Sequence, residues 1–242
     1  MIPERPAKND ESFSYPFFYG LHHVFISKDI TILLCFLEYC TEERTWQMEL
    51  LVINGSPHRS GNTSRLLKEV MNSAEDGGMQ VTEFFADEKK IRACRGCDSC
   101  VKNHRCIIRD DMDELYEMLQ RADAVVIGTP VFWFGMTAQT KTVLDRMYAC
   151  NTEGIKARIG GIVVTAGSSG VIDTIKHLTF VFSTMGIIVA DSIGSYIPVE
   201  SNGKAAEAAR RMGKTISVIC SEYGDGLPKV KAHHIAYGTH TK

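Results

Sequence analysis

Short apolar runs alternate with helical patterns from residue 48 onward. Leu50–Ile53 is an uninterrupted apolar run closed by Asn54-Gly55, as expected for a strand that is buried on both faces. After the next loop, apolar residues recur at helical spacing until Gly77-Gly78, at Leu66, Leu67, Val70, Met71 and Ala74. The pattern predicts a strand followed by a helix that covers it, with Thr63 able to cap the helix.

The same alternation continues along the chain. Further strands are expected at Val81–Phe85, Ala124–Gly128, Gly161–Thr165 and Ile187–Ile193. Further helices are expected at Met112–Gln120, Thr137–Tyr148, Val171–Met185 and Lys204–Ser221. Asp110 is expected to cap the first of these helices. Because right-handed crossovers place helices on both faces of a parallel sheet, we expect an α/β fold with a doubly wound, five-stranded parallel sheet.

The chain is expected to hold one domain, because 242 residues at 44% hydrophobic composition can bury one good core. We assign residues 48–222 to this domain and 223–242 to a C-terminal tail. Residues 1–47 are aromatic and broken by prolines, then apolar at Ile30–Leu37 without a clear period. They are interpreted as an extension that packs on the domain or on a second subunit, or as a poorly ordered leader.

Charge and hydropathy exclude two classes of partner. A net charge of −2 and a charged fraction of 23% give no broad basic field, so nucleic acid is not expected as a partner. No apolar run approaches the roughly 20 residues that a membrane helix requires. The first ten residues lack the basic-then-apolar order of a secretory signal. We therefore expect a cytoplasmic protein that acts on a small molecule or on another redox protein.

A Gly- and Ser-rich loop, residues 55–63, follows the first predicted strand and is called the phosphate loop below. In doubly wound sheets, ligands bind beyond the carboxyl ends of the strands. Short donors beside a helix N-terminus suit a phosphate. The spacing is neither the dinucleotide fingerprint nor a Walker loop, so a monophosphate fits best. An ordinary capping turn is the alternative. The candidate phosphate ligands are Ser56, His58, Ser60, Gly61, Asn62 and Thr63.

Two further loops follow predicted strands. Residues 129–135, the aromatic segment, hold three successive aromatic rings that can form the wall for a planar heterocycle. The alternative is a core or dimer-interface role. Residues 167–170, the Gly-Ser loop, offer N–H groups and hydroxyls for a polar ring edge, although a plain turn is equally compatible. The candidate residues are Pro130, Val131, Phe132, Trp133, Phe134, Gly135, Gly167, Ser168 and Ser169.

The runs Val52–Pro57, Gly61–Thr63 and Gly128–Gly135 resemble the NADPH-dependent FMN reductase and iron–sulfur flavoprotein superfamily. The resemblance covers about residues 48–220. It implies a flavodoxin-like fold, flavin mononucleotide (FMN) as cofactor, and dimers whose active site lies near a subunit interface. It assigns the phosphate loop to the FMN phosphate, the aromatic segment to the isoalloxazine and the Gly-Ser loop to its far edge. Phe132 stands where such proteins often carry tyrosine, and residues 1–47 have no recognised counterpart.

Four cysteines crowd into residues 94–106, the cysteine segment. Their spacing is C-x2-C-x2-C-x5-C, formed by Cys94, Cys97, Cys100 and Cys106. Four thiolates in such a run can ligate a 4Fe-4S cluster, and the motif matches the compact motif of the iron–sulfur flavoproteins. The phosphate loop, the aromatic segment and the Gly-Ser loop are called the flavin loops below. Because the cysteine segment follows the second strand, we expect it at the same edge of the sheet as these loops. Electrons could then pass directly between the cluster and the flavin.

Two other interpretations of the cysteines stay open. Zinc also accepts four thiolates, but structural zinc sites usually have two separated C-x2-C pairs. The other interpretation is a cluster-free reductase in which these cysteines are buried or redox-active. The cations expected to offset cluster charge, or else to form a solvated or docking surface, are Arg92, Arg95, Lys102, Arg105 and Arg109. The other four cysteines are interpreted as small core residues: Cys35, Cys40, Cys150 and Cys220.

Three functions follow from these features. The first is an FMN and 4Fe-4S flavoprotein that transfers electrons between a ferredoxin-like carrier or NAD(P)H and a small acceptor. The second is a cluster-free, NAD(P)H-dependent FMN, quinone or nitro reductase. The third is a non-enzymatic, flavodoxin-like electron carrier. In each case the cofactor carries the chemistry, no catalytic side chain is required, and a homodimer or higher oligomer is expected.

Overall fold

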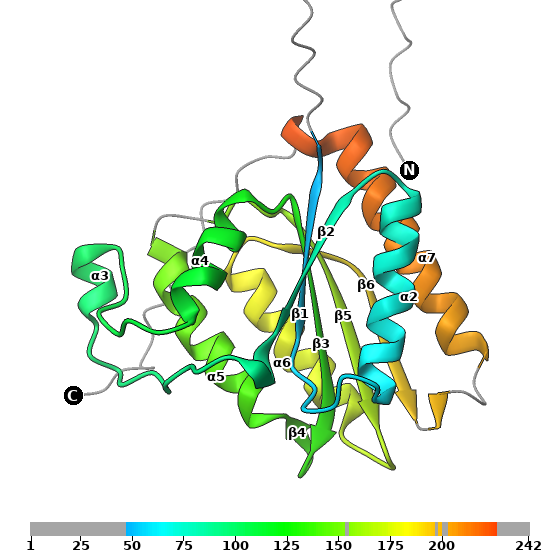
Figure 1. Ribbon diagram of the computed structural model, residues 1–242, viewed down its shortest axis with the longest axis horizontal. Coiled ribbons are helices and arrows are strands. Elements are labelled where there is room, and N and C mark those ends of the chain that lie inside the picture. The colour runs from blue at the N-terminus through cyan, green and yellow to red at the C-terminus, as the bar shows by residue number, and fades with distance from the viewer. Residues whose placement is uncertain (1–46, 153–154, 197, 200–202, 227–242) are drawn as a thin grey trace, which may run out of the picture. The chain divides into compact units, whose positions relative to one another are not determined.

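Five parallel strands form the central sheet of the computed structural model, which describes residues 47–152, 155–196, 198–199 and 203–226 (Figure 1). The strands are β1 (Glu49–Asn54), β2 (Gln80–Phe85), β3 (Ala124–Phe132), β5 (Ile159–Ala166) and β6 (Ile188–Tyr196). Their order across the sheet is β2-β1-β3-β5-β6, which is the strand order of flavodoxin-like folds. The predicted fold class and its five strands are confirmed.

Two predicted regions lie largely outside the described residues. The extension expected over residues 1–47 is described only at Gln47, and the tail expected over 223–242 only as far as a short turn, η4 (Gly224–Gly226). Their boundaries and roles stay predictions. Among the described residues, no helix has both the length and the hydropathy needed to cross a membrane.

Helices cover both faces of the sheet (Figure 1). One face is covered by α2 (Asn62–Asp76) and α7 (Gly203–Tyr223), and the other by α4 (Met112–Arg121), α5 (Ala138–Met147) and α6 (Val171–Thr184). Between β2 and α4 lie the short turn η1 (Ala86–Glu88) and the five-residue helix α3 (Ser99–Asn103). A further short turn, η2 (Tyr148–Thr152), follows α5.

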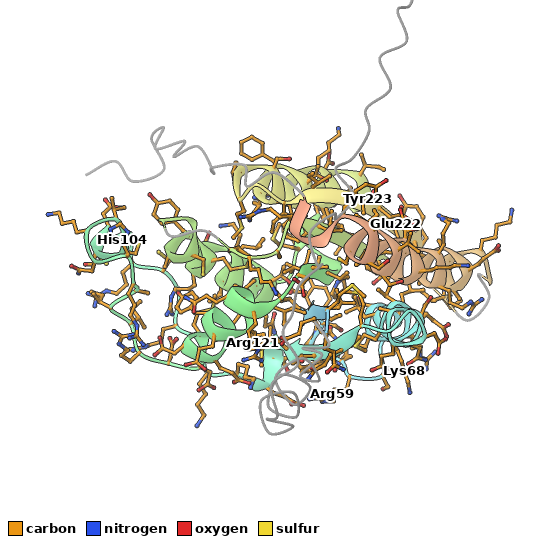
Figure 2. All side chains as sticks on the ribbon, turned by 90° about the horizontal axis from the view of Figure 1, so that it is seen from above. Arg59, Lys68, His104, Arg121, Glu222 and Tyr223 are labelled. Carbon is orange, nitrogen blue, oxygen red and sulfur yellow. The ribbon has the colours of Figure 1, made fainter. Side chains whose placement is uncertain are left out.

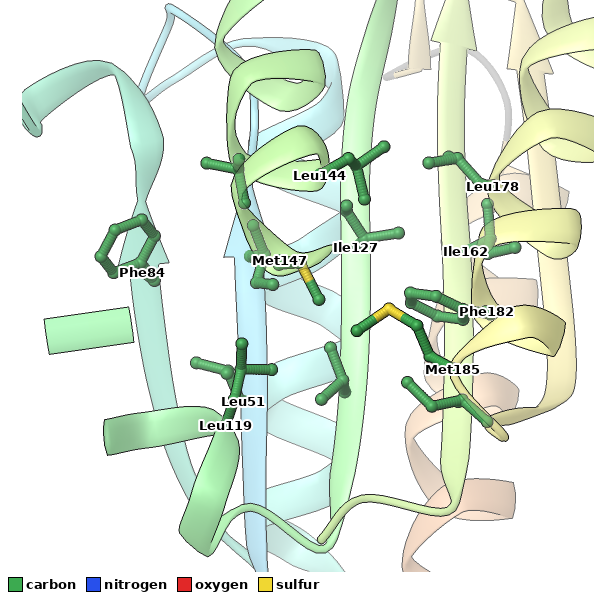
Figure 3. Close-up of a cluster of buried hydrophobic side chains, with 14 of the residues drawn as sticks. Leu51, Phe84, Leu119, Ile127, Leu144, Met147, Ile162, Leu178, Phe182 and Met185 are labelled. Atoms are coloured by element: carbon green, nitrogen blue, oxygen red, sulfur yellow. The ribbon is translucent and has the colours of Figure 1, made fainter. Parts of the chain in front are cut away.

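Strand β1 shows why the apolar run at Leu50–Ile53 is uninterrupted. Leu50 and Val52 belong to the hydrophobic cluster under α2 and α7, whereas Leu51 and Ile53 belong to the cluster under α4, α5 and α6. Successive side chains of a strand point to opposite faces, so a strand between two helix layers is apolar at every position. Figure 3 shows part of the second cluster, with Leu51 of β1 among its side chains.

The structure differs from the sequence prediction at several element ends. The N-cap of α4 is Asp111 and not the predicted Asp110. Helix α2 begins at Asn62 with Gly61 as its N-cap, so Thr63 lies inside the first turn and is not the cap. Strand β3 continues four residues beyond the predicted end at Gly128 and pairs with a two-residue strand, β4 (Gly135–Met136), in antiparallel register. The aromatic segment is therefore a β-hairpin and not an irregular loop.

Candidate functional site

Three loops meet at the carboxyl edge of the sheet. Gly55 of the phosphate loop donates its N–H to the carbonyl of Gly128 at 2.8 Å, directly before the aromatic segment. The hydroxyl of Thr137, two residues after that segment, donates to the carbonyl of Gly55 at 2.6 Å. The hydroxyls of Thr63 and Thr165 lie 2.7 Å apart, which joins the phosphate loop to the strand that leads into the Gly-Ser loop. The predicted convergence of these loops is observed.

A cluster of buried threonines packs against the phosphate loop at Gly55. The hydroxyl of Thr137 lies 2.8 Å from that of Thr140, and the Thr140 hydroxyl donates to that of Thr129 at 3.0 Å. A Cβ atom on Gly55 would lie only 1.8 Å from the Thr140 hydroxyl. Glycine is thus required at position 55 by close packing. Thr129 begins the aromatic segment but was not among its predicted ligands, and the sequence did not single out Thr137 or Thr140, because isolated threonines carry no motif.

The phosphate loop is also held by two polar residues that sequence reasoning missed. The side-chain oxygen of Asn54 accepts from the N–H of Ser56 at 3.1 Å, and its amide nitrogen donates to the Ser64 hydroxyl at 2.9 Å. Ser64 in turn donates to the carbonyl of His58 at 2.8 Å. The hydroxyl of Ser56, a predicted ligand, is buried and accepts from the N–H of His58 at 3.1 Å.

The start of helix α2 supplies the donors best suited to an anion. Its N-cap, Gly61, has no side chain and makes no side-chain cap, so first-turn N–H groups are left for another acceptor. Ser60 and His58 are exposed beside it. Thr63 is buried and bonded to Thr165, and the side-chain oxygen of Asn62 accepts from the N–H of Val199 at 3.0 Å. The loop therefore fits a phosphate through backbone N–H groups and the exposed Ser60 and His58.

Arg59 is a cation in the phosphate loop that the motif did not include. Its guanidinium hydrogen-bonds Glu88, lies 3.6 Å from Glu83 and stands 4.3 Å over the ring of Phe85. The hydrogen bond from Arg59 lowers the pKa of Glu88. The main contacts of Arg59 are therefore with residues of β2 and the turn that follows it, where two carboxylates neutralise its charge.

The aromatic segment presents its rings to solvent. Phe132, Trp133 and Phe134 are 49%, 93% and 66% exposed. Trp133 and Phe134 form the turn of the hairpin with φ angles of 45° and 67°. This left-handed region suits the tight turns of hairpins but is costly for residues that carry a Cβ atom. Backbone strain of this kind concentrates at functional sites, so these exposed rings are candidates for contact with a ligand.

The Gly-Ser loop lies directly against the aromatic segment. Gly170 has a φ angle of 88°, and a Cβ atom there would lie 2.7 Å from Val131 and 3.2 Å from the backbone of Phe134. Gly167, Ser168 and Ser169 are exposed next to this contact. Exposed rings on one loop and exposed N–H and hydroxyl groups on the adjacent loop fit a planar heterocycle with a polar edge. The donor set at this edge of the sheet thus fits FMN.

The cysteine segment lies elsewhere, which corrects the expectation that it shares this edge. The chain leaves β2 beside the start of α5, where Gln139 donates to Asp87 at 2.7 Å. At Arg92 it has reached the last turn of α5, where Arg146 donates to the carbonyl of Arg92 at 2.8 Å. Helix α3 then contacts η2, the short turn that directly follows α5. A ten-residue helix is about 15 Å long, so the cysteines and the flavin loops lie at opposite ends of α5.

In Figure 2, which views the protein from above, His104 of the cysteine segment lies at the left, whereas Arg59 of the phosphate loop lies at the lower edge near the middle. The sequence could not show where the cysteine segment lies, because the order of strands and loops determines only where the segment begins and not where it runs.

The four thiols of the cysteine segment are free and at least partly accessible. A hydrogen bond from Ser99, helped by the charge of Arg95, lowers the pKa of Cys97. Burial, followed by the charges of Cys106, Cys94 and Cys97, raises the pKa of Cys100. Among the described residues, no three His, Cys, Asp or Glu side chains are close enough to share one metal ion.

Thiol chemistry nevertheless fits an iron–sulfur cluster. A cubane takes each thiolate on a separate iron atom, so the sulfur atoms need not meet around one ion. A fifth thiol, Cys150, lies in η2, where burial and the charge of Cys100 raise its pKa to about 12. Cys150 and Cys106 line a cavity of about 430 Å³ between the cysteine segment and α4. Cys150 thus borders the cysteine segment, in addition to packing as predicted.

Several predicted cations of the cysteine segment are ion-paired. Arg92 lies 3.7 Å from Asp110, and Arg105 and Arg109 lie 3.8 and 3.2 Å from Asp113. These pairs reduce the positive charge that was expected to offset a cluster. Asp110, which the sequence indicated as a helix-start charge, thus binds the segment as well, and so does Asp113, which the sequence did not single out.

Comparison with known proteins agrees with this geometry. The family model for NADPH-dependent FMN reductases matches residues 48–200. An iron–sulfur flavoprotein of Archaeoglobus fulgidus is 34% identical over 174 residues, which cover 70% of this chain and 79% of that protein. An iron–sulfur flavoprotein of Methanocaldococcus jannaschii is 29% identical over 188 residues, which cover 71% of this chain and 97% of that protein.

The solved structures support the fold alone. A flavodoxin from the domain Archaea superimposes with a TM-score of 0.50 at 19% identity and covers 72% of this chain and 99% of that flavodoxin. The comparison agrees with the strand order and confirms the flavodoxin-like fold.

Proposed function

This chain belongs to the NADPH-dependent FMN reductase family, among the iron–sulfur flavoproteins, and on that premise we propose that it is an FMN-dependent oxidoreductase. The observation that carries the proposal is the convergence of the phosphate loop, the aromatic segment and the Gly-Ser loop at one edge of the sheet. Together they offer an anion site, exposed rings and a polar edge within one connected surface.

Residues of all three loops would hold the cofactor. The phosphate would lie at the start of α2, against the N–H groups after Gly61 and the side chains of Ser60 and His58. The rings of Phe132–Phe134 would cover the isoalloxazine, and Gly167–Ser169 would donate to its polar edge. FMN, when bound, supplies the exchange between two-electron and one-electron chemistry. The protein contributes binding, orientation and hydrogen bonds, and no side-chain base is required.

We further propose a 4Fe-4S cluster on Cys94, Cys97, Cys100 and Cys106. Four free thiols within a 13-residue segment and the lowered pKa of Cys97 support it, since cluster ligands are thiolates. The electron donor would be NAD(P)H or a ferredoxin-like carrier, and the acceptor a small molecule. Crowded free thiols persist in a reducing compartment, which favours the cytoplasm.

A homodimer is part of the proposal. Trp133 is 93% exposed at the end of the aromatic segment, and exposed aromatic residues are enriched where subunits meet. The separation of the cysteine segment from the flavin loops by the length of α5 supports the same assembly, because a second copy could place its cysteine segment near these loops.

A second candidate is a cluster-free NAD(P)H-dependent reductase of flavins, quinones or nitro compounds. The same separation favours it, because chemistry at the flavin loops then proceeds without the cysteine segment.

The test is an anaerobic visible spectrum of the purified protein with iron, sulfide and flavin analysis. We expect flavin bands with a broad iron–sulfur shoulder, and Cys97→Ala is expected to lose the shoulder and keep the flavin bands. Flavin bands alone, with full NAD(P)H oxidation, would establish the cluster-free reductase instead. A protein that neither retains nor rebinds FMN would contradict the whole proposal.

A further inference from the structure

Arg146, in the last turn of α5, is the largest fully buried side chain in the described part of the protein. Its side chain is 0% exposed. Arginine is rarely buried unless it is paired, because removing its charge from water is costly. The contacts of Arg146 therefore indicate which part of the structure requires its buried charge.

The guanidinium of Arg146 binds the chain on both sides of the cysteine segment. Its Nη1 donates to the carbonyl of Arg92 at 2.8 Å, and its Nη2 to the carbonyl of Ile108 at 3.1 Å. Arg92 precedes Cys94 by two residues, and Ile108 follows Cys106 by two. One side chain thus joins the two ends of the segment.

Asp110 completes the arrangement. Its carboxylate accepts from Nη1 and Nη2 of Arg146 at 2.9 and 3.1 Å, in a two-pronged pairing. The same carboxylate accepts from the N–H of Arg92 at 2.9 Å and from that of Met112 at 3.2 Å. Burial alone raises the pKa of Asp110, but the hydrogen bonds from Arg146, Arg92 and Met112 leave that pKa below its ordinary value. The carboxylate therefore stays charged at neutral pH.

Stability alone does not account for this ion pair. A buried ion pair can often be replaced by well-packed apolar residues without loss of stability. One donor, Nε of Arg146, has no hydrogen-bond partner within the described residues. The pair is better explained by the segment whose two ends it joins.

We propose that Arg146 is a positioning residue for the cysteine segment, because with Asp110 it holds the two ends together and arranges the four thiols for an iron–sulfur cluster. The inference rests on the cluster of the proposed function and extends it to a residue outside the cysteine motif. The guanidinium is suited to this role because its planar fork can bind two carbonyls and a carboxylate at once, whereas a lysine ammonium cannot.

The test uses the full-length protein with a double variant, Arg146→Met with Asp110→Leu, which removes the pair and leaves no unpaired buried charge. Arg146→Lys keeps the charge and loses the fork. The control is Arg210→Met with Glu69→Leu, which removes an ion pair of 2.7 Å between α2 and α7, away from the cysteine segment. For each protein, iron release to a chelator, FMN content and the thermal unfolding midpoint are measured under anaerobic conditions.

We expect the double variant to release iron about 10- to 100-fold faster than the wild type, as is typical when groups that support metal ligands are lost. The iron-release rate of Arg146→Lys is expected to lie between those of the wild type and the double variant. The control is expected to release iron at the wild-type rate. FMN content and the unfolding midpoint should not change in the double variant, which separates positioning from general stability. Iron release at the wild-type rate from the folded double variant would overturn the proposal.

A second measurement keeps the inference independent of the cluster. Amide hydrogen exchange over residues 93–107 is followed in the iron-free proteins. Faster exchange in the double variant than in the wild type would support the role of Arg146 even if the wild type held no iron, in which case only the cluster of the proposed function fails. Equal exchange in the two iron-free proteins would overturn the role of Arg146 itself.

Discussion

Trp133 and Phe134 combine two costs, exposure of large rings to water and left-handed backbone angles. A glycine or asparagine would form the same hairpin turn more easily. The position of these rings beside the Gly-Ser loop gives a reason for both costs, since the rings can cover a bound heterocycle. The conflict between local preference and observed structure is typical of a functional site.

Replacing Phe134 separates the two costs. Phe134→Ala removes the ring and keeps a Cβ atom in the left-handed region, whereas Phe134→Gly also removes the strain. We expect the glycine variant without FMN to be more stable than the alanine variant by about 1 kcal/mol, measured by urea unfolding. Both variants are expected to bind FMN up to about 10-fold more weakly, because they lose the same ring contact.

Fluorescence titration with FMN is the second measurement for these variants. Wild-type affinity in both would show that the Phe134 ring does not contact the flavin. Different affinities in the two would assign the effect to the turn geometry instead.

The hydroxyl pair of Thr63 and Thr165 allows a double-variant cycle. Thr63→Val leaves the buried Thr165 hydroxyl without this partner and is expected to cost about 1–3 kcal/mol of unfolding free energy. Thr63→Val with Thr165→Val removes both partners and is expected to recover most of that loss. Urea unfolding of the wild type, Thr63→Val, Thr165→Val and the double variant measures the coupling between the two hydroxyls.

FMN affinity in the same cycle decides how Thr63 acts. Because its side chain is buried against Thr165, we expect the double variant to bind FMN as the wild type does, with Thr63 contributing through its N–H. A loss of affinity in the double variant equal to that in the single one would show that the hydroxyl itself reaches the phosphate.

Helix α5 is the element that both candidate sites share. Thr137, its N-cap, donates to the phosphate loop at Gly55, and Arg146, in its last turn, binds the ends of the cysteine segment. The helix covers its part of the sheet through Val143, Leu144 and Met147. One helix therefore positions two groups of functional residues at its opposite ends.

The pair at the end of α5 predicts a pH dependence of stability. The folded-state pKa of Asp110 lies below its ordinary value, so the charged carboxylate favours the folded state above the unfolded pKa of about 4, and this contribution is lost as the pH falls further. At neutral pH the two apolar side chains of the double variant are expected to offset it, which leaves the unfolding midpoint unchanged. The unfolding free energy of the iron-free wild type should therefore fall more steeply from about pH 5 to about pH 3 than that of the Arg146→Met, Asp110→Leu variant. Parallel pH profiles would show that the pair adds no pH-dependent stability.

Elements with a local signal could be predicted from the sequence. The five apolar runs became β1, β2, β3, β5 and β6, because burial between two helix layers leaves an unmistakable pattern. The hairpin at Trp133-Phe134 could not be predicted, since nothing in those residue types favours a tight turn. Arg146 gave no signal either, because an arginine in an amphipathic helix ordinarily faces water.

The arrangement of the whole chain depends on contacts that local patterns do not contain. The loops after β1, β3 and β5 were expected to meet because parallel topology requires it, and they do. The cysteine segment was expected beside them for the same reason. An insert of this length can run anywhere over the surface, and here the contacts of Arg92 with Arg146 take it to the far end of α5.

This separation leads to a prediction for the proposed homodimer. If one copy passes electrons from its cluster to the flavin of the other, two defective copies can complement each other. Cys97→Ala is expected to lack the cluster and keep FMN. Ser60→Asp, at an exposed position of the phosphate loop, is expected to lack FMN and keep the cluster, because its carboxylate repels the phosphate.

Mixed dimers carrying one copy of each variant are isolated with two affinity tags and assayed with reduced ferredoxin and a quinone. Neither parent dimer is expected to be active, because each lacks one centre, whereas the mixed dimer holds a cluster in one copy and FMN in the other. We expect activity in the mixed dimer, since the cluster and the flavin loops of a single chain are separated by the whole of α5. An inactive mixed dimer that contains both cofactors would place the transfer within one chain, across that helix.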